Sequence, residues 1–252
     1  MGNVFSRLAN YGYIHHRALN DFSHFDAAEK HLTNYPGTPQ VLEGDLCWDF
    51  EDGRQDFYFH HPDFVWDALS ASTVAKQRRS GELVMLEDML KRDTSDRHYV
   101  IELKVGRGDV KAAMQKLVEV LQANCRDRFW IDGFSLKLAR MVKAIDPSVV
   151  ASLHTERVTD DHVWVVAPDQ WPTRVKFGDL SGIDAIAIRK RYSDEHMACA
   201  SAAVIKHGFK LIMSRLFTLE DYALSRKWGA IIGYPKADFA DVMRFNTERG
   251  FA

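Results

Sequence analysis

The chain of 252 residues has little cysteine, almost no net charge and no long hydrophobic run. Its three cysteines, Cys47, Cys125 and Cys199, are odd in number and far apart, which argues against a disulfide framework and is typical of a reducing compartment. We therefore expect a cytoplasmic protein. Because no apolar stretch has the length of a signal peptide or of a bilayer-crossing helix, we expect no membrane span.

The charge balance argues against a protein that attracts its partner through a large net charge of one sign. Thirty-three basic and 35 acidic residues give a formal net charge of -2, so nothing draws the whole chain to nucleic acid or to an anionic membrane. Any anion must be held locally, and the expected partner is a small molecule. A hydrophobic fraction of 46% with 27% charged residues is ordinary for a globular protein.

Apolar runs typical of strands alternate with segments of helical pattern along the whole chain. Strands are expected near 11–16, 39–46, 98–104, 128–133, 148–153, 183–188, 209–214 and 229–233. Helices are expected near 22–34, 84–92, 109–124, 136–145, 193–207 and 218–228, with capping residues at Asp109, Ser193 and Thr218. Eight alternating units predict a (β/α)8 TIM barrel, a single α/β domain over residues 1–252 with small insertions.

Two segments fall outside the alternation and are expected to be insertions. The apolar run 162–166 lies between the fifth and sixth strands and is expected to form a hairpin or loop. The segment 62–83 carries Lys76, Arg78 and Arg79 and is expected to be a solvated loop.

Charged side chains interrupt two of the apolar strands at a spacing of two. Because side chains alternate across a strand, Glu43 and Asp45 share one face, and so do Glu102 and Lys104. In a barrel, functional groups gather at the carboxyl ends of the strands. We therefore expect these residues to end the second and third strands, and His16 to end the first, on one rim. Carboxylates, histidines and cations together indicate phosphate chemistry around a hard metal ion.

Short motifs in a fixed order support the same interpretation. They are His16-Arg17-Ala18, Glu43-Gly44-Asp45, Asp52-Gly53, His60-His61-Pro62, Ile101-Glu102-Leu103-Lys104, Phe134-Ser135 and Gly233-Tyr234-Pro235. This order resembles the glycerophosphodiester phosphodiesterase family, whose motifs read His-Arg-Gly, Glu-x-Asp, Asp-Gly, His-Asp-Pro, Ile-Glu-x-Lys, Ser-Phe-Ser and Thr-Asp-Tyr-Pro. The resemblance covers nearly the whole chain.

The resemblance implies a role for each residue that matches a motif. Glu43, Asp45 and Glu102 are implied ligands of one divalent cation, either Mg²⁺ or Ca²⁺. Arg17 and Lys104 are implied to hold phosphoryl oxygens. The implied proton-transfer pair is His16 as base or nucleophile and His60 as acid, or the reverse. The implied reaction is cleavage of a phosphodiester to a phosphomonoester and an alcohol, directly or through a cyclic phosphate.

Departures from the family pattern concern the alcohol pocket. The Asp of the His-Asp motif is His61, which is expected either to lie at the surface or to orient substrate or a ligand. The tryptophan of the seventh strand is replaced by Ser214-Arg215. A pocket with Arg215, and with Arg189 and Lys190 near it, suits a sugar or a second anionic group. The agrocinopine phosphodiesterases, which act on sugar phosphodiesters called opines, are one such branch that the chain resembles.

Three interpretations therefore stay open at this point. The first is a glycerophosphodiester hydrolase of lipid metabolism, and the second is an opine-type sugar-phosphodiester hydrolase. The third is a non-catalytic barrel that binds a phosphorylated metabolite, although binding alone needs no pair of histidines. Among the remaining histidines, His154 ends the fifth strand and is the one most expected to reach the pocket.

Overall fold

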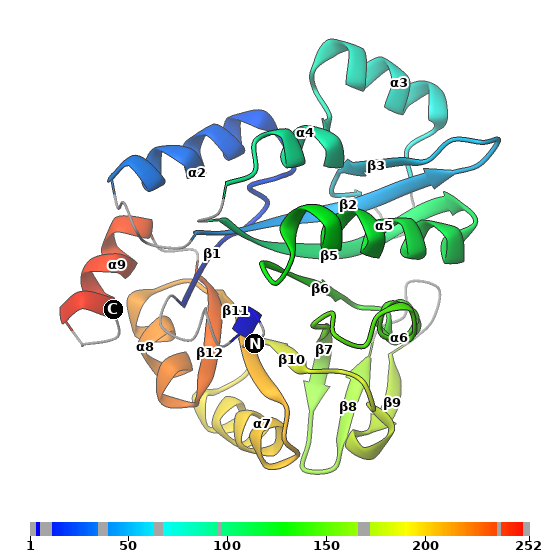
Figure 1. Cartoon of the computed structure of the whole chain (residues 1–252). Helices are drawn as coiled ribbons and strands as arrows, with labels where there is room; N and C mark the ends of the chain where they lie inside the picture. The colour runs from blue at the N-terminus through cyan, green and yellow to red at the C-terminus, as the bar shows by residue number, and fades with distance from the viewer. Residues whose placement is uncertain are drawn as a thin grey trace.

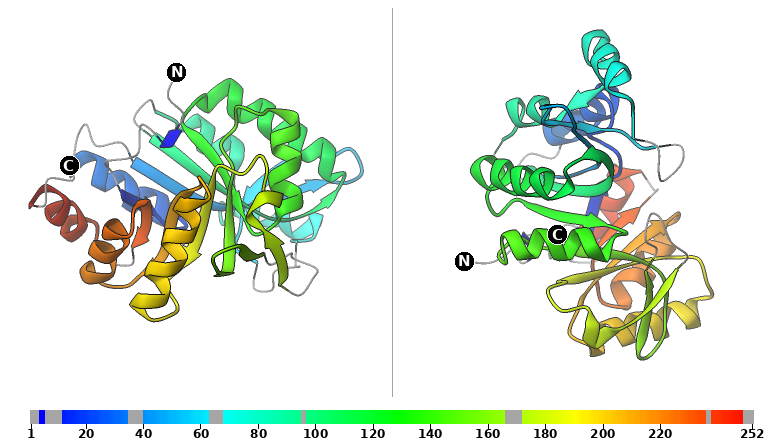
Figure 2. Two further views of the ribbon diagram at one scale, coloured as in Figure 1. Left: turned by 90° about the horizontal axis from the view of Figure 1, so that it is seen from below. Right: turned by 90° about the vertical axis from the view of Figure 1, so that its right-hand side faces the viewer.

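The computed structural model describes residues 4–5, 12–34, 40–62, 68–94, 97–165, 172–235 and 238–248. In this part of the chain the strands belong to one sheet of 12. Helices cover the outside of that sheet (Figure 1; Figure 2).

Eight parallel strands form a closed ring, because each pairs with its neighbour and the last pairs with the first. The sixth and seventh strands of the sheet meet through a bridge between Ile131 and Ala151, supported by a hydrogen bond from Ile131 N to Val150 O of 2.9 Å. The ring consists of β1 (Gly12–His15), β2 (Gln40–Phe50), β5 (Arg97–Gly108), β6 (Phe129–Gly133), β7 (Ser152–Val158), β10 (Ala185–Arg189), β11 (Lys210–Leu216) and β12 (Ala230–Pro235). The predicted (β/α)8 barrel is confirmed.

The predicted helices are also present. They are α2 (Phe22–Asn34), α4 (Leu86–Lys91), α5 (Val110–Cys125), α6 (Leu136–Ile145), α7 (Asp194–Lys206) and α8 (Leu219–Lys227). The Asp109, Ser193 and Thr218 side chains accept backbone hydrogen bonds from the first turns of α5, α7 and α8, as their positions predicted. A further helix, α9 (Phe239–Glu248), follows β12 and was not predicted.

The insertion after β2 differs from the expectation. Residues 63–67 lie outside the described residues. In the chain, β3 (Asp56–Phe59) precedes them, and α3 (Ala71–Ser80) and β4 (Val84–Met85) follow. The loop predicted for Lys76 to Arg79 is wrong, because these residues belong to α3, although Lys76, Arg78 and Arg79 are exposed. Ser70 caps this helix at its start, and Gly81 ends it with a left-handed φ of 73°.

The insertion after β7 is the predicted hairpin. Strands β8 (His162–Val165) and β9 (Thr173–Lys176) pair antiparallel with each other, and β8 pairs antiparallel with β7. A single turn of 3-10 helix, η1 (Phe177–Asp179), leads on to β10. Among the described residues, the hairpin and this turn therefore occupy the position between β7 and β10 that an α-helix occupies in the other strand-helix units.

The interior of the ring is packed shut near the amino ends of the strands. Ile14, Val41, Val100 and Trp130 lie there fully buried, and Phe5 packs edge-on against Trp130 with ring centroids 5.5 Å apart. The larger apolar clusters lie between the strands and the surrounding helices. Among the described residues, the interior of the ring is therefore filled at this end, and it opens at the carboxyl end of the barrel.

In the described residues, no helix has both the length and the apolar character that a membrane span requires.

We predict that Gly44→Ala lowers the free energy of unfolding by about 1–3 kcal/mol in urea denaturation, because overpacking costs that much. A Cβ at position 44 would lie 2.6 Å from Leu19 Cβ and 2.6 Å from the Phe59 ring. Strand propensity alone would make the alanine variant more stable than wild type. The close contacts outweigh this effect and make the variant less stable. Gly178→Ala is the control, since nothing lies within 4 Å of its added Cβ. A Gly44→Ala protein as stable as wild type would contradict this packing.

Candidate active site

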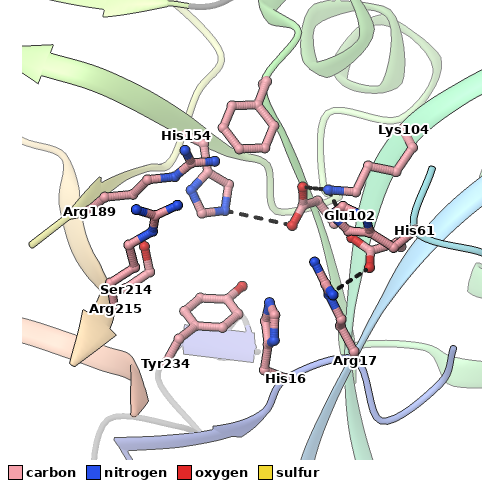
Figure 3. A pocket seen from close by; sticks show the side chains of 12 residues that line it. His16, Arg17, His61, Glu102, Lys104, His154, Arg189, Ser214, Arg215 and Tyr234 are labelled. Carbon is pink, nitrogen blue, oxygen red and sulfur yellow. Dashed lines mark hydrogen bonds and ion pairs between the residues drawn. The ribbon is translucent and has the colours of Figure 1, made fainter. Parts of the chain in front are cut away.

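A cavity of about 220 Å³ opens at the carboxyl end of the barrel (Figure 3). Its walls include seven residues that the sequence singled out for the site, together with Arg189, which it placed near the pocket. Those seven are His16, Arg17, Asp45, His61, Glu102, Lys104 and Arg215. Glu43 lies buried beneath the wall, within reach of Asp45 and Glu102. The remaining predicted residue, His60, is not among the described residues that line the cavity.

Strand register places acidic side chains side by side on one half of the rim. Asp45 of β2 is level with Glu102 of β5, and Glu102 is level with Asp132 of β6. Glu43 lies two residues before Asp45 and shares its face. The predicted gathering of Glu43, Asp45 and Glu102 is therefore present.

One detail of that expectation is wrong. Glu43 and Asp45 do not end their strand, because β2 continues to Phe50 and stays paired with β5 as far as Gly108. For the same reason Glu102 and Lys104 do not end β5. Gly106 allows this extension, since a Cβ there would lie 2.2 Å from the Trp48 ring. The carboxylates consequently lie in the middle of a long strand pair, where their backbone is held on both sides.

The three carboxylates form a group with the composition of a cation site. Ligand atoms of Glu43, Asp45 and Glu102 lie within 4.8 Å of one another, and all three residues are buried. Oε1 of Glu43 is buried without a hydrogen-bond partner in the described structure. Burial, together with the charges of Asp45 and Glu102, raises the pKa of Glu43 well above its usual value. A divalent cation bound to oxygen ligands fits this set, because it would satisfy the orphaned oxygen and offset the repulsion.

Lys104 partly neutralises the acidic group. Its Nζ lies 2.8 Å from Asp45 Oδ1 and also pairs with Glu102. Burial alone would raise the pKa of Asp45, but Lys104 and the hydrogen bond from Asn20 bring it below its usual value. The Arg17 guanidinium also lies near Asp45, so two cations face three carboxylates, and a net negative charge remains for a metal ion to balance when all three are ionised.

The turn after β1 holds the carboxylates from the other side. Arg17 has a left-handed φ of 58°, and its backbone N–H donates to Glu43 Oε2 over 2.5 Å. Asn20 donates to Asp45 Oδ2 over 2.6 Å and accepts from Asp45 N over 2.9 Å. The Arg17 guanidinium lies 3.5 Å from Asp45 and stays 41% exposed, so it faces the cavity. Sequence reasoning missed Asn20, because a single asparagine in a turn carries no signal beyond turn formation.

Two histidines line the cavity on this side. His16 directly follows β1, and His61 follows β3. Partial burial lowers the pKa of His61 against the opposing effect of the Asp45 carboxylate. His60 instead lies where β3 leaves β2, with its N–H donating to Asp45 O over 2.8 Å and its carbonyl accepting from Cys47 Sγ. Successive side chains of an extended chain point in opposite directions, which explains why only one of the two lines the cavity.

A buried network extends the acidic row on β6 and β7. Asp132 Oδ2 lies 2.8 Å from His154 Nε2 and accepts a hydrogen bond from the Tyr234 hydroxyl over 3.1 Å. Ser152 and Gly133 N donate to its other oxygen. Burial alone would lower the pKa of His154, but the Asp132 charge raises it. His154 lines the cavity as expected, whereas no pattern in the sequence singled out Asp132.

The opposite half of the rim is basic and polar. Arg189 of β10 is level with Ser214 of β11, which is level with Tyr234 of β12, and all three line the cavity. Arg215 adds a second guanidinium beside them (Figure 3). The cavity therefore has an acidic wall and a basic wall facing each other.

No protein-family model matches the chain, and no curated protein matches it. Comparison with known proteins therefore rests on solved structures.

Several glycerophosphodiester phosphodiesterases of known structure match the chain over nearly its full length. The enzyme of Parabacteroides distasonis matches 95% of this chain and 98% of its own, at 12% identity and a TM-score of 0.65. The phosphodiesterase of Oleispira antarctica, solved in complex with the product sn-glycerol-3-phosphate, matches 98% and 100% at 13% identity and a TM-score of 0.66. The enzyme of Agrobacterium tumefaciens matches 93% and 98% at 16% identity and a TM-score of 0.58. The chain has the fold of the glycerophosphodiester phosphodiesterases, as the order of its motifs implied.

Proposed function

We propose that the protein is a metal-dependent phosphodiesterase that hydrolyses a small glycerol- or sugar-phosphodiester to a phosphomonoester and an alcohol. One observation carries this proposal: a group of three buried carboxylates lies at the wall of the cavity, with Glu43 just beneath it. His16, His61 and the cations of Arg17 and Lys104 line the same cavity. The likeness in fold to enzymes of this class supports it.

Glu43, Asp45 and Glu102 would hold the divalent cation, Mg²⁺ or Ca²⁺. The bound ion supplies positive charge to a phosphoryl oxygen. Around it, the Arg17 guanidinium binds a second phosphoryl oxygen in a fork, and Lys104 pairs with Asp45 and Glu102 and holds their carboxylates in position. These contacts oppose the negative charge that otherwise repels a nucleophile from the phosphodiester.

His16 and His61 carry the proton transfers in this proposal. One imidazole removes a proton from the attacking oxygen as the new P–O bond forms, and the other gives a proton to the departing ester oxygen as the old P–O bond breaks, which releases the alcohol. The motif resemblance gave the second role to His60. We assign it to His61, because His61 and not His60 is among the described cavity residues.

We predict that His16→Ala and His61→Ala each lower kcat by about 10²–10⁴-fold, the usual contribution of a general acid or base. The measurement is steady-state turnover of glycerophosphodiesters with Mg²⁺ or Ca²⁺. His60→Ala is expected to lower kcat by less than about tenfold, because His60 is not among the described residues that line the cavity.

His24→Ala, on the exposed face of α2, is the control for a histidine outside the cavity. Equal losses for His60→Ala and His61→Ala would return the acid role to His60. No turnover of any diester by the wild-type protein with either metal would favour a binding protein over an enzyme.

We predict that Glu43→Gln, Asp45→Asn and Glu102→Gln each weaken Mg²⁺ or Ca²⁺ binding by at least about tenfold in isothermal titration calorimetry. Loss of a residue that only orients a ligand already costs about 10–100-fold, so loss of a ligand costs no less. In wild type, metal at roughly 100 times its Kd should raise the free energy of unfolding by about 2.7 kcal/mol.

The matched control is Asp49→Asn, which removes another buried carboxylate of β2 that pairs with Arg54 instead. It should retain wild-type metal affinity. Full metal affinity in any of the three ligand variants would remove that residue from the proposed site.

A further inference from the structure

Ser214 and Arg215 both line the cavity although they are consecutive residues of β11. In a regular strand they would face opposite sides of the sheet. Here Ser214 is level with Tyr234 and Leu216 is level with Pro235, so Arg215 is an extra residue with no counterpart on β12. This bulge turns the Arg215 side chain toward the cavity.

The backbone of Arg215 has the left-handed φ of 62°. Non-glycine residues adopt this conformation rarely, and such outliers gather at ligand-binding and active sites. The same conformation occurs at Arg17, which holds Glu43. Arg17 lies just after β1 and Arg215 lies at the bulge in β11, so both arginines with a left-handed backbone line the cavity.

The Arg215 guanidinium has no hydrogen-bond or ion-pair partner among the residues that the structure describes. Its neighbour Arg189 lies over the Phe134 ring at 4.6 Å and shares Glu156 with Arg191. Burial and the charges of Arg191 and Arg215 lower the pKa of Arg189 below its usual value. Three guanidinium groups, those of Arg189, Arg191 and Arg215, therefore lie near one another, and one carboxylate, that of Glu156, offsets part of their charge.

These two arginines are not needed for the phosphodiester itself. Arg17 and Lys104 lie beside the metal carboxylates, while Arg189 and Arg215 lie together on the other side of the cavity (Figure 3). A diester bound at the acidic wall would extend one of its alcohols toward the basic wall. Arginine pairs are suited to planar or tetrahedral anions, which they bind through forked hydrogen bonds.

We propose that Arg189 and Arg215 bind a second anionic group, a carboxylate or a phosphate, carried by one of the two alcohols that the phosphodiester joins. This substrate class rests on the proposed phosphodiesterase function. Binding of the second anion relieves the repulsion between the two guanidinium groups, and it gives Arg215 the partner that the described protein does not supply.

The binding test compares glycerol 1,3-bisphosphate with glycerol 3-phosphate by isothermal titration calorimetry in the presence of Mg²⁺. We expect the bisphosphate to bind wild type about tenfold or more tightly, since a charge-assisted hydrogen bond contributes at least that factor. Arg215→Gln and Arg189→Gln should remove most of this difference.

Two further variants sharpen the comparison. Arg215→Gly removes the guanidinium but accepts the left-handed backbone without strain, so it separates loss of the contact from loss of the fold. Arg107→Gln removes a charge from the extended end of β5, where Arg107 pairs with Glu51 outside the cavity. It should keep the wild-type difference between the two ligands.

The turnover test uses three diesters that differ only in one terminal group: glycerophosphoglycerol, glycerophosphoglycerate and glycerophosphoglycerol phosphate. We expect kcat/KM to be about tenfold or more higher for at least one charged diester, and Arg215→Gln to lower that ratio. The charged diester with the higher value identifies the anion as carboxylate or phosphate.

Equal binding of the two phosphates by wild type, or a ratio that Arg215→Gln leaves unchanged, would overturn the second-anion site. Failure of all three diesters to react would instead overturn the phosphodiesterase proposal, and the calorimetric comparison would then decide the second-anion site by itself.

Discussion

The site depends on holding the carboxylates of Glu43, Asp45 and Glu102 together in a buried place. Like charges at this spacing repel one another, and burial adds a desolvation cost to each. Lys104 offsets part of that cost from β5, and the Arg17 backbone and Asn20 side chain offset another part from the turn after β1. What remains uncompensated is the buried Oε1 of Glu43, and a divalent cation is the group whose chemistry fits it.

The barrel converts this local arrangement into a polarised cavity. Neighbouring strands β2, β5 and β6 bring Asp45, Glu102 and Asp132 into one row, and strands β10 to β12 do the same for Arg189, Ser214 and Tyr234. Because the ring is closed, the two rows face each other across a small space. Under the proposed function, a cation would bind at one wall and an anion at the other, so a substrate with negative charge at two places would match the cavity as a whole.

Most of the fold was predictable, because the patterns that specify it are local. Strand alternation and the helix caps at Asp109, Ser193 and Thr218 depend on residues a few positions apart. Helix α3 escaped prediction because Val74 is its one buried residue in a largely polar segment, so no apolar stripe marks it. The extension of β2 to Phe50 also escaped, since it depends on Gly106 of β5 making room for Trp48.

The sequence by itself determined which side chains share a face: Glu43 with Asp45, and Glu102 with Lys104, because the two-residue period of a strand is a property of the backbone. It also determined the eight-unit barrel. Only the tertiary structure decided that Asp132 lies level with Glu102, that His61 rather than His60 lines the cavity, and that a bulge turns Arg215 inward. Each of these depends on how strands far apart in the chain pair with one another, and no local pattern encodes that register.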